Sequence, residues 1–400
     1  NVARLNFSHG THAGHRKTIE TFRKVRDELG VPAAVLLDTK GPEIRVGDFE
    51  NGSEMLEAGD TFILTSEKCI GTAQRADTTY KALPTQVEAG TVILIDDGRI
   101  RMEVTDTTDT DVICRVLSGG KISNRKGVNI PNKSLDLEYI SEADRSDILF
   151  GIEMDVDYVA ASFVRSGDDV RALRKLLNDN GGEKIKIISK IENTEGIANF
   201  AEILDLSDGI MVARGDMGVE VDFEKLPGIQ KKFIKECCRA GKPVITATQM
   251  LESMTTSTSP TRAEITDVAN AVFDGTSAVM LSGESAAGMF PVETVQAMAK
   301  IVHQAEIDAE EVNQYKFLEV ESDEKDIANA IGHAACTTAK DIKAKAIIAV
   351  TTSGYTAEMM SKYKPVEKII AATPVEKTYH QQSLTRGVFP VLTDFSSDWD

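Results

Sequence analysis

From residue 157 onward the chain repeats one pattern: a short apolar run, a polar turn, and a segment with the apolar spacing of an amphipathic helix. Two more apolar runs precede it, at Val2–Phe7 and Ala33–Leu37, separated by a helical pattern at Arg16–Leu29. The later runs are Tyr158–Val164, Ile185–Ile191, Gly209–Ala213, Pro243–Thr248 and Ser277–Leu281, and the helical patterns between and after them are Asp168–Leu177, Glu195–Leu204, Gly228–Ala240, Arg262–Phe273 and Pro291–Gln304. Apolar strands that alternate with helices indicate a parallel sheet buried on both faces.

These seven βα units predict a (β/α)8 barrel of the TIM type, which has eight. The barrel would comprise residues 1–42 and 138–308. The chain opens at the edge of a strand, so we expect that the first βα unit is missing and lies upstream of Asn1.

Between the second and third of these strands the pattern changes to alternation of apolar and polar residues. Val92 and Leu94 alternate before the dipeptide Asp97-Gly98, and Ile100, Met102 and Val104 alternate after it. An Asp-Gly dipeptide between alternating strands is a strong hairpin signal. Residues 43–137 are therefore predicted to form an inserted all-β domain, a small β-barrel. An insertion at a strand end lies over the mouth of the barrel, so we favour a lid over a passive decoration.

A third region, residues 309–400, has the pattern of a small open α/β domain. We expect helices at Asp326–Asp341 and Thr356–Lys364 and strands at Ala346–Val350, Ile369–Ala372 and Phe389–Leu392. The pattern stops without a closing helix, which predicts that the C-terminal end is truncated.

Composition excludes several classes of protein. The net charge of −18 opposes nonspecific binding to nucleic acid or to anionic membranes. The longest apolar runs fall short of a membrane span. Five scattered cysteines with no CxxC pair argue against a disulfide framework or a zinc site. We therefore expect a protein of a reducing compartment, the cytoplasm, with no nucleic-acid or membrane partner.

Polar and charged residues gather where the predicted strands end, which is where barrel enzymes place their active sites. In a strand, positions i and i+2 point to the same side, so Lys190 and Glu192 converge. A self-contained salt bridge would explain this pair alone. With Asp216 at the next strand end, two carboxylates suit Mg²⁺, which takes few protein ligands.

The segment Arg214-Gly215-Asp216-Met217-Gly218 follows a strand and contains two glycines. Backbone N–H groups in such a turn can bind a carboxylate or a phosphate. A plain turn is the simpler interpretation of this segment taken alone, and the pair Lys190 and Glu192 one strand earlier favours an anion site.

The chain as a whole resembles the pyruvate kinase family. Motifs in family order span nearly the whole sequence: Arg4-Leu5-Asn6-Phe7-Ser8-His9-Gly10, Asp38-Thr39-Lys40-Gly41-Pro42-Glu43-Ile44-Arg45, Ser189-Lys190-Ile191-Glu192-Asn193, Arg214-Gly215-Asp216-Met217-Gly218, Ala247-Thr248-Gln249-Met250-Leu251-Glu252-Ser253-Met254, Pro260-Thr261-Arg262-Ala263-Glu264 and Met280-Leu281-Ser282-Gly283-Glu284. The resemblance implies phosphoryl transfer from phosphoenolpyruvate to ADP, giving pyruvate and ATP, the last step of glycolysis.

The resemblance also implies the role of each site residue. Lys190 stabilises an enolate-like transition state, while Thr248 and Ser282 relay a proton. The substrate would be held by Arg4, Lys190, Gly215, Asp216 and Thr248, and the nucleotide by His9, Arg45 and Lys126. Arg4 and Arg45 face the transferred phosphate. The metal ligands would be Glu192 and Asp216 for Mg²⁺ (or Mn²⁺) and Asn6, Ser8, Asp38 and Thr39 for K⁺. Relatives with a glutamate at the position of Glu43 typically depend on K⁺.

In the third region, hydroxyls and a glycine precede a predicted helix. N-capping explains one hydroxyl but not four. The resemblance implies an effector site for the phosphate of a sugar phosphate, formed by Thr351, Thr352, Ser353, Gly354 and Thr356, in an allosteric homotetramer. Thr352 is neutral where some relatives have a lysine, so the identity of the effector stays open.

Two alternatives remain at this stage. A barrel lyase or aldolase that acts on a pyruvate enolate would also need Mg²⁺, paired carboxylates and an arginine. It would not need the β lid or a second basic set that includes Lys126. A ligand-binding chain without turnover is the other alternative, because an open barrel exposes strand edges.

Overall fold

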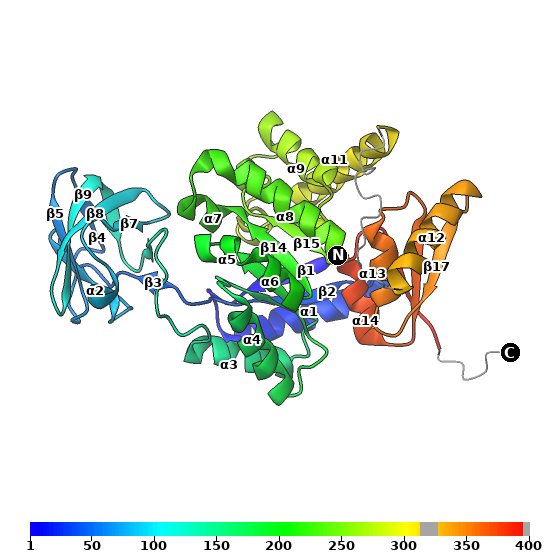
Figure 1. Ribbon diagram of the computed structural model, residues 1–400, viewed down its shortest axis with the longest axis horizontal. Coiled ribbons are helices and arrows are strands. Elements are labelled where there is room, and N and C mark those ends of the chain that lie inside the picture. The colour runs from blue at the N-terminus through cyan, green and yellow to red at the C-terminus, as the bar shows by residue number, and fades with distance from the viewer. Residues whose placement is uncertain (313–326, 395–400) are drawn as a thin grey trace.

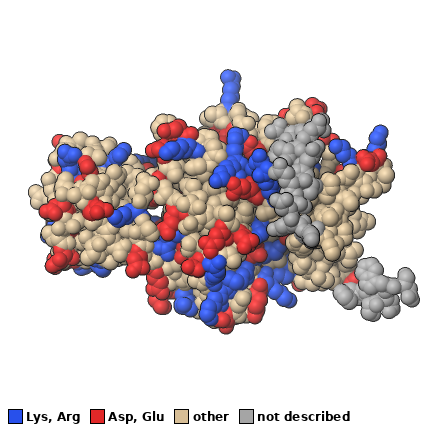
Figure 2. Space-filling view, in the orientation of Figure 1, with Lys and Arg blue, Asp and Glu red and all other residues tan. Residues whose placement is uncertain are grey.

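The computed structural model describes residues 1–312 and 327–394. Three parts lie in a row in Figure 1: an all-β insertion at one end, a central α/β body, and a small α/β region at the other end. Among the described residues, no helix is long and apolar enough to cross a membrane. On the face shown in Figure 2, acidic and basic side chains are interspersed over the central body.

The central body is built on one sheet of seven parallel strands whose spatial order follows the chain. Each expected strand is present. The strands are β1 (Val2–Asn6), β2 (Ala34–Asp38), β12 (Tyr158–Ala161), β13 (Lys186–Ile191), β14 (Gly209–Ala213), β15 (Val244–Ala247) and β16 (Ala278–Val279). Because all neighbouring pairs are parallel, the carboxyl ends of these strands share one edge of the sheet.

Helices pack around this sheet (Figure 1). They are α1 (His12–Leu29), α3 (Glu142–Glu153), α4 (Gly167–Asp179), α5 (Thr194–Ala198), α6 (Phe200–Leu206), α7 (Arg214–Glu220), α8 (Leu226–Ala240), α9 (Arg262–Asp274), α10 (Gly283–Ala286) and α11 (Pro291–Glu311), with 3-10 turns η1 (Phe223–Lys225) and η2 (Glu252–Thr255). Local signals start some of them: Thr261 and Glu264 form a complete capping box at α9.

Three features differ from the predicted helices. The pattern at Glu195–Leu204 is two helices, α5 and α6, because Asn199 leaves the helical conformation and its amide donates to the carbonyl of Arg165. Helix α3 was not predicted, although Ser141 caps it in the expected way. The turn expected at 214–218 is the start of helix α7.

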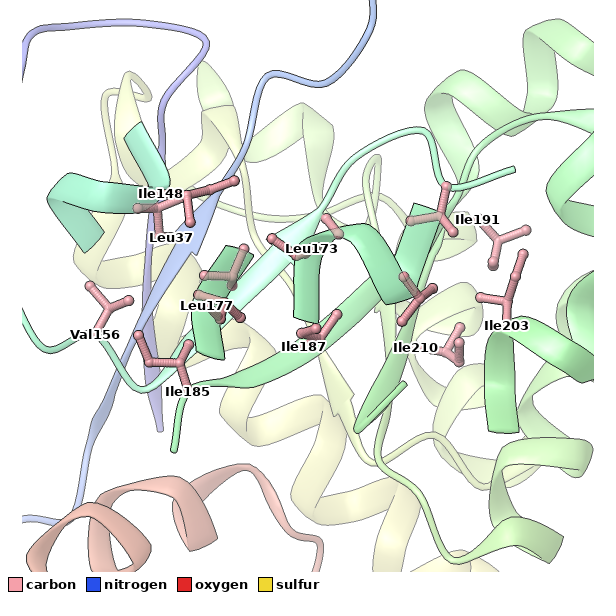
Figure 3. Close-up of a cluster of buried hydrophobic side chains, with 14 of the residues drawn as sticks. Leu37, Ile148, Val156, Leu173, Leu177, Ile185, Ile187, Ile191, Ile203 and Ile210 are labelled. Carbon is pink, nitrogen blue, oxygen red and sulfur yellow. The ribbon is translucent and has the colours of Figure 1, made fainter. Parts of the chain in front are cut away.

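Aliphatic side chains from the strands and helices form the main core between these two layers (Figure 3). Leu37 and Ile187 come from strands, while Leu173 and Leu177 come from α4 and Ile203 from α6, and all five are almost completely buried. Burial of one such side chain contributes about 1.5–3 kcal/mol. The core therefore holds the strand ends, and the side chains on them, in place.

The insertion between β2 and α3 is all-β apart from one short helix. The hairpin expected at Asp97-Gly98 is present, with β7 and β8 antiparallel. Its elements are β3 (Ile44–Arg45), β4 (Ser53–Leu56), β5 (Thr61–Thr65), β6 (Arg75–Asp77), α2 (Leu83–Gln86), β7 (Val92–Ile95), β8 (Ile100–Thr107), β9 (Asp111–Ser118), β10 (Gly120–Ser123) and β11 (Gly127–Asn129). A separate apolar core holds it together.

The third region contains a three-stranded parallel sheet, β17-β18-β19. Its elements are α12 (Ile327–Asp341), β17 (Ala346–Val350), α13 (Tyr355–Lys362), β18 (Lys368–Thr373), α14 (Glu376–Gln381), η4 (Gln382–Leu384) and β19 (Val388–Leu392). Helix α14 was not predicted. The boundary expected after Asp308 falls inside α11, which continues to Glu311, and the first residue of the helix expected at Asp326–Asp341 lies outside the described residues.

This region packs at the amino-terminal ends of the central strands. The hydroxyl of Tyr158 donates to the carbonyl of Gln381 at 2.6 Å, and the ammonium of Lys186 lies 2.5 Å from Glu358. Tyr158 and Lys186 begin β12 and β13. The third region therefore lies at the opposite edge of the sheet from the strand ends that carry the candidate site.

Candidate active site

Side chains from the ends of three central strands meet in one buried group. The guanidinium of Arg4 on β1 lies 2.5 Å from a carboxylate oxygen of Asp38 on β2. The ammonium of Lys190 on β13 donates to the other oxygen of Asp38 at 3.0 Å and lies 3.1 Å from Glu192. Asp38, Lys190 and Glu192 are all buried. The predicted convergence of Lys190 and Glu192 is confirmed, and Asp38 joins them.

Ser162, just beyond β12, completes the contacts of Lys190. The ammonium donates to its hydroxyl oxygen at 2.7 Å, and that hydroxyl donates to the carbonyl of Thr39 at 2.7 Å. Ser162 is a residue of this site to which sequence reasoning assigned no role. Its position at a buried strand end was the signal that could have found it.

Glu192 is fixed from its other side by the backbone. The N–H of Phe163 donates to the second carboxylate oxygen of Glu192 at 2.6 Å. Phe163 has a φ of 53°, in the left-handed region that bulky residues rarely adopt. This strained turn aims its N–H at the carboxylate.

Electrostatics divide the charged groups into two sets. Burial lowers the pKa of Lys190, but Asp38 and Glu192 outweigh it and hold that pKa above its ordinary value. Burial raises the pKa of Asp38, and Lys190 and Arg4 together hold it below the usual range. Lys190 therefore stays charged at neutral pH, and so does Asp38.

The other two carboxylates shift in the opposite direction. Burial raises the pKa of Glu192 to about 7, against the attraction of Lys190 and with the repulsion of Asp216. Burial also raises the pKa of Asp216, opposed by Lys190, with the charges of Asp97 and Glu43 adding to the rise. For both carboxylates, the positive charge of Lys190 is too small to offset the cost of burial.

These two carboxylates fit a divalent cation. The site has three carboxylates, the buried Asp38 and Glu192 and the half-buried Asp216, against the two cations Arg4 and Lys190. Over residues 1–312 and 327–394, no three His, Cys, Asp or Glu side chains converge as a metal cage. A cation held by Glu192 and Asp216 would thus take its other ligands from water or substrate, as Mg²⁺ usually does.

The loop after β15 reaches the same area. The hydroxyl of Thr248 accepts a hydrogen bond from the N–H of Gly215, the second residue of α7, at 2.8 Å. One N–H group of the expected anion site, that of Gly215, is therefore already hydrogen-bonded to the hydroxyl of Thr248. Ser282 follows β16, and its N–H donates to the fully buried Glu284 at 2.7 Å.

Asp38 is also one of the four residues expected to bind K⁺, and Asn6 and Thr39 lie beside it. Asn6 pairs with Asp38 in the register of β1 and β2, and its side-chain oxygen accepts from the N–H of Ser8 at 3.1 Å. The hydroxyl of Thr39 accepts from the N–H of Ser162 at 3.0 Å. The K⁺ site formed by Asn6, Ser8, Asp38 and Thr39 stays a prediction.

Three predicted site residues make other contacts. Arg45 donates to Glu43 at 2.8 Å and to the carbonyl of Arg125 at 2.7 Å. Lys126 lies 2.6 Å from Asp96 in the insertion. The carbonyl of His9 accepts from His15. The structure does not bring these three into contact with the Lys190 group.

Four of the expected effector residues, Thr351 to Gly354, form the loop between β17 and α13, and the fifth, Thr356, lies in the first turn of α13. The N–H of Gly354, whose φ is 89°, donates to the hydroxyl of Thr351 at 2.9 Å. The carbonyl of Thr352 accepts from Thr378, and the hydroxyl of Ser353 accepts from the N–H of Tyr355. This loop is separate from the Lys190 group.

An ammonium and a guanidinium beside three carboxylates, at the carboxyl edge of a parallel sheet, define an enzyme for an anionic substrate that binds together with a cation. Residues 1–295 match the family description "Pyruvate kinase, barrel domain", and residues 329–400 match "Pyruvate kinase, alpha/beta domain". The chain belongs to the pyruvate kinase family and is a phosphotransferase of glycolysis.

Individual relatives support this assignment. The chain is 49% identical to a pyruvate kinase of Clostridium acetobutylicum, covering 98% of this chain and 83% of that protein. It is 49% identical to one of Staphylococcus haemolyticus, covering 98% and 67%. The crystal structure of a pyruvate kinase from Cryptosporidium parvum superposes with a TM-score of 0.93 at 42% identity, covering 98% of this chain and 82% of that one.

Proposed function

We propose that the Lys190 group is the centre at which phosphoenolpyruvate passes its phosphoryl group to ADP, with Mg²⁺ (or Mn²⁺) and K⁺ as cofactors. The observation that supports this best is the buried ammonium of Lys190, bound to Asp38 and Glu192 beside Arg4. Phosphoryl transfer asks a protein mainly for positioning and for neutralisation of charge. The lyase alternative loses support because the chain belongs to a kinase family.

In this proposal each site residue has a defined task, and Asp216 and Thr248 each have two. Arg4 and Arg45 neutralise the phosphate, and Gly215, Asp216 and Thr248 hold the substrate carboxylate. Lys190 stabilises the negative oxygen that appears when the phosphoryl group leaves. A Mg²⁺ ion on Glu192 and Asp216 would add Lewis acidity there. The hydroxyls of Thr248 and Ser282 then relay a proton from water to the methylene carbon.

We also propose the finer architecture. Residues 1–42 and 138–308 would belong to a closed (β/α)8 barrel, residues 43–137 to a lid, and residues 309–400 to a regulatory domain. Thr351, Thr352, Ser353 and Gly354 of the loop after β17, with Thr356 in the first turn of α13, would bind the phosphate of a sugar-phosphate effector in a homotetramer. Hydroxyls and a left-handed glycine ahead of α13 support this.

Potassium dependence tests the proposed cation site. Replacing K⁺ by tetramethylammonium at constant ionic strength should lower ADP-dependent pyruvate release at least about tenfold, or ~1.4 kcal/mol of barrier. Glu43→Lys should relax this requirement, because an ammonium would replace the charge of the ion. Glu43→Gln is the control, since it also breaks the ion pair with Arg45 and adds no charge. Equal rates in both salts would contradict the proposal.

Two observations support a lid function for the insertion. Asn129 donates to Glu220 of α7 at 3.2 Å, and the charge of Asp97 acts on Asp216. If the lid closes over nucleotide, each charge contact strengthens as water leaves. Lys126 lies in the same insertion, paired with Asp96, where closure would bring it to the nucleotide phosphates.

Lys126→Ala should therefore raise the KM for ADP about tenfold and lower kcat, with the affinity for phosphoenolpyruvate unchanged. Arg125→Ala is a matched control, since its side chain pairs with Asp48 on the exposed surface. Hydrogen exchange of residues 43–137 should slow with Mg-ADP and a substrate analogue. Exchange that ignores ligand, with normal kinetics in Lys126→Ala, would make the insertion passive.

A further inference from the structure

The side chain of Arg214, the first residue of α7, turns toward the loop after β15. Its guanidinium donates to the carbonyl of Ala247 at 3.2 Å and to the carbonyl of Thr248 at 2.6 Å. It also contacts the sulfur of Met250 at 2.8 Å. One buried guanidinium therefore contacts three residues of a single four-residue segment, 247–250.

A carboxylate on a different helix, α9, also binds this guanidinium. Both oxygens of Asp267 on α9 accept from Arg214, at 2.8 and 2.7 Å, and Gln230 on α8 lies at 3.5 Å. The side chain of Arg214 is only 10% exposed. Charge-assisted pairs of this kind are strong and directional. The position of the guanidinium is thus set by α9 as well as by its own backbone.

The segment that Arg214 holds is strained. Thr248 has a φ of 69° and Gln249 a φ of 53°. A β-branched residue in this left-handed region is an outlier that costs about 1–3 kcal/mol and persists only where neighbours impose it. This backbone turns the carbonyls of Ala247 and Thr248 to Arg214, and the hydroxyl of Thr248 meets the N–H of Gly215.

We infer that Arg214 is a positioning residue for proton delivery: with Asp267 it holds Thr248 in the left-handed conformation that fixes its hydroxyl between the carbonyl of Ala247, at 2.6 Å, and the N–H of Gly215. This rests on the proposed role of Thr248. Arg214 and Gly215 are adjacent in the chain. The side chain of Arg214 donates to the carbonyl of Thr248, and the N–H of Gly215 donates to its hydroxyl. A lysine has one compact ammonium and cannot bind two carbonyls and a carboxylate in this planar arrangement.

The test measures deuterium incorporation into the methyl group of pyruvate in D₂O with ATP, Mg²⁺ and K⁺, which is proton delivery in reverse. Arg214→Lys should slow incorporation about 10- to 100-fold, because small misplacements of reacting groups have effects of this size. Asp267→Asn should cause a smaller loss in the same direction. It also keeps the test available if Arg214→Lys fails to fold.

A double-mutant cycle separates positioning from general stability. In a Thr248→Ala background, Arg214→Lys should add less than about twofold, because residues that act through one another are not additive. Arg174→Lys is the control: Arg174 also binds a backbone carbonyl and an aspartate, Ile185 and Asp208, at the amino-terminal ends of the strands. It should leave incorporation unchanged even if the melting temperature falls.

Amide hydrogen exchange of residues 247–251 should rise in Arg214→Lys. Additive losses in the cycle, or unchanged exchange at these amides, would overturn the inference. Normal incorporation in Thr248→Ala would instead refute the proton role of Thr248 itself. A slow Thr248→Ala with a normal Arg214→Lys would refute only the role of Arg214.

Discussion

Lys190→Met should lower kcat by about 10²–10³-fold, the loss expected when a preorganised charge at a developing oxyanion is removed. The ammonium is buried, permanently charged and already close to Asp38 and Glu192. Methionine keeps much of the volume of the side chain and removes the charge. Steady-state kinetics of pyruvate release would measure the effect, and a variant that keeps a tenth of its activity would remove Lys190 from the mechanism.

Binding of the divalent cation should survive this change. Glu192 and Asp216 both remain, and less positive charge nearby strengthens attraction for a cation. Mn²⁺ titration should therefore give an affinity no weaker than that of the unaltered chain. Loss of a buried partner should lower stability by about 3–5 kcal/mol, so kinetics are compared below the melting transition of the variant.

Lys186→Met is the matched control for this experiment. Lys186 lies on the same strand, and its ammonium is 2.5 Å from Glu358, far from the strand end that holds Lys190. The control should lose stability and change kcat by no more than a few-fold. A similar collapse of kcat in both variants would point to damage of β13 and not to lost charge stabilisation.

Glu192→Gln should weaken Mn²⁺ binding at least about 100-fold, because loss of even an outer partner of a metal ligand costs about 10–100-fold in affinity. Activity should fall with it at any practical Mg²⁺ concentration. Glu195→Gln, three residues further on, is the control; its carboxylate accepts a hydrogen bond from the hydroxyl of Ser134 at 3.2 Å. Equal Mn²⁺ affinity in the two variants would exclude Glu192 as a ligand.

The pKa of Glu192 adds a pH signature to the same experiment. Burial raises this pKa to about 7, and a proton competes with a cation for the carboxylate. Affinity should therefore fall by about tenfold per pH unit below 7 for one displaced proton, and Glu192→Gln should remove that slope.

Stability of the metal-free protein should show the opposite dependence. Between the ordinary pKa of a glutamate and about 7, the folded chain binds a proton that the unfolded chain has released. This contribution is complete at low pH and is lost as pH rises through about 7. Thermal unfolding at pH 6 and pH 8, with and without Mg²⁺, would measure it. Added Mg²⁺ should restore the stability lost at pH 8.

The sequence by itself determined the order of the central strands and the identity of the residues at their ends. Apolar runs that alternate with helical patterns are local signals. Parallel strands bring their carboxyl ends to one edge, so Lys190, Glu192 and Asp216 could be grouped in advance. Lys190 and Glu192 share a side because side chains in a strand alternate.

Helix boundaries followed from the sequence only where caps or breaks were visible in it. The capping residues Ser141 and Thr261 mark the starts of α3 and α9, although we overlooked the first. The break at Asn199 was not visible, because its amide binds the carbonyl of Arg165, which is 34 residues away. Apolar periodicity shows which face of a helix is buried, but it does not show a distant residue whose hydrogen bond breaks the helix.

Only the tertiary structure decided how the charges behave and which groups hold Thr248. The pKa of Glu192 near 7 depends on burial that several elements create together. Arg214 looked like part of an anion-binding turn, yet its guanidinium faces Ala247, Thr248 and the more distant Asp267. Periodicity and motif spacing place a residue at a strand end, but the direction of a long side chain depends on partners that only packing brings within reach.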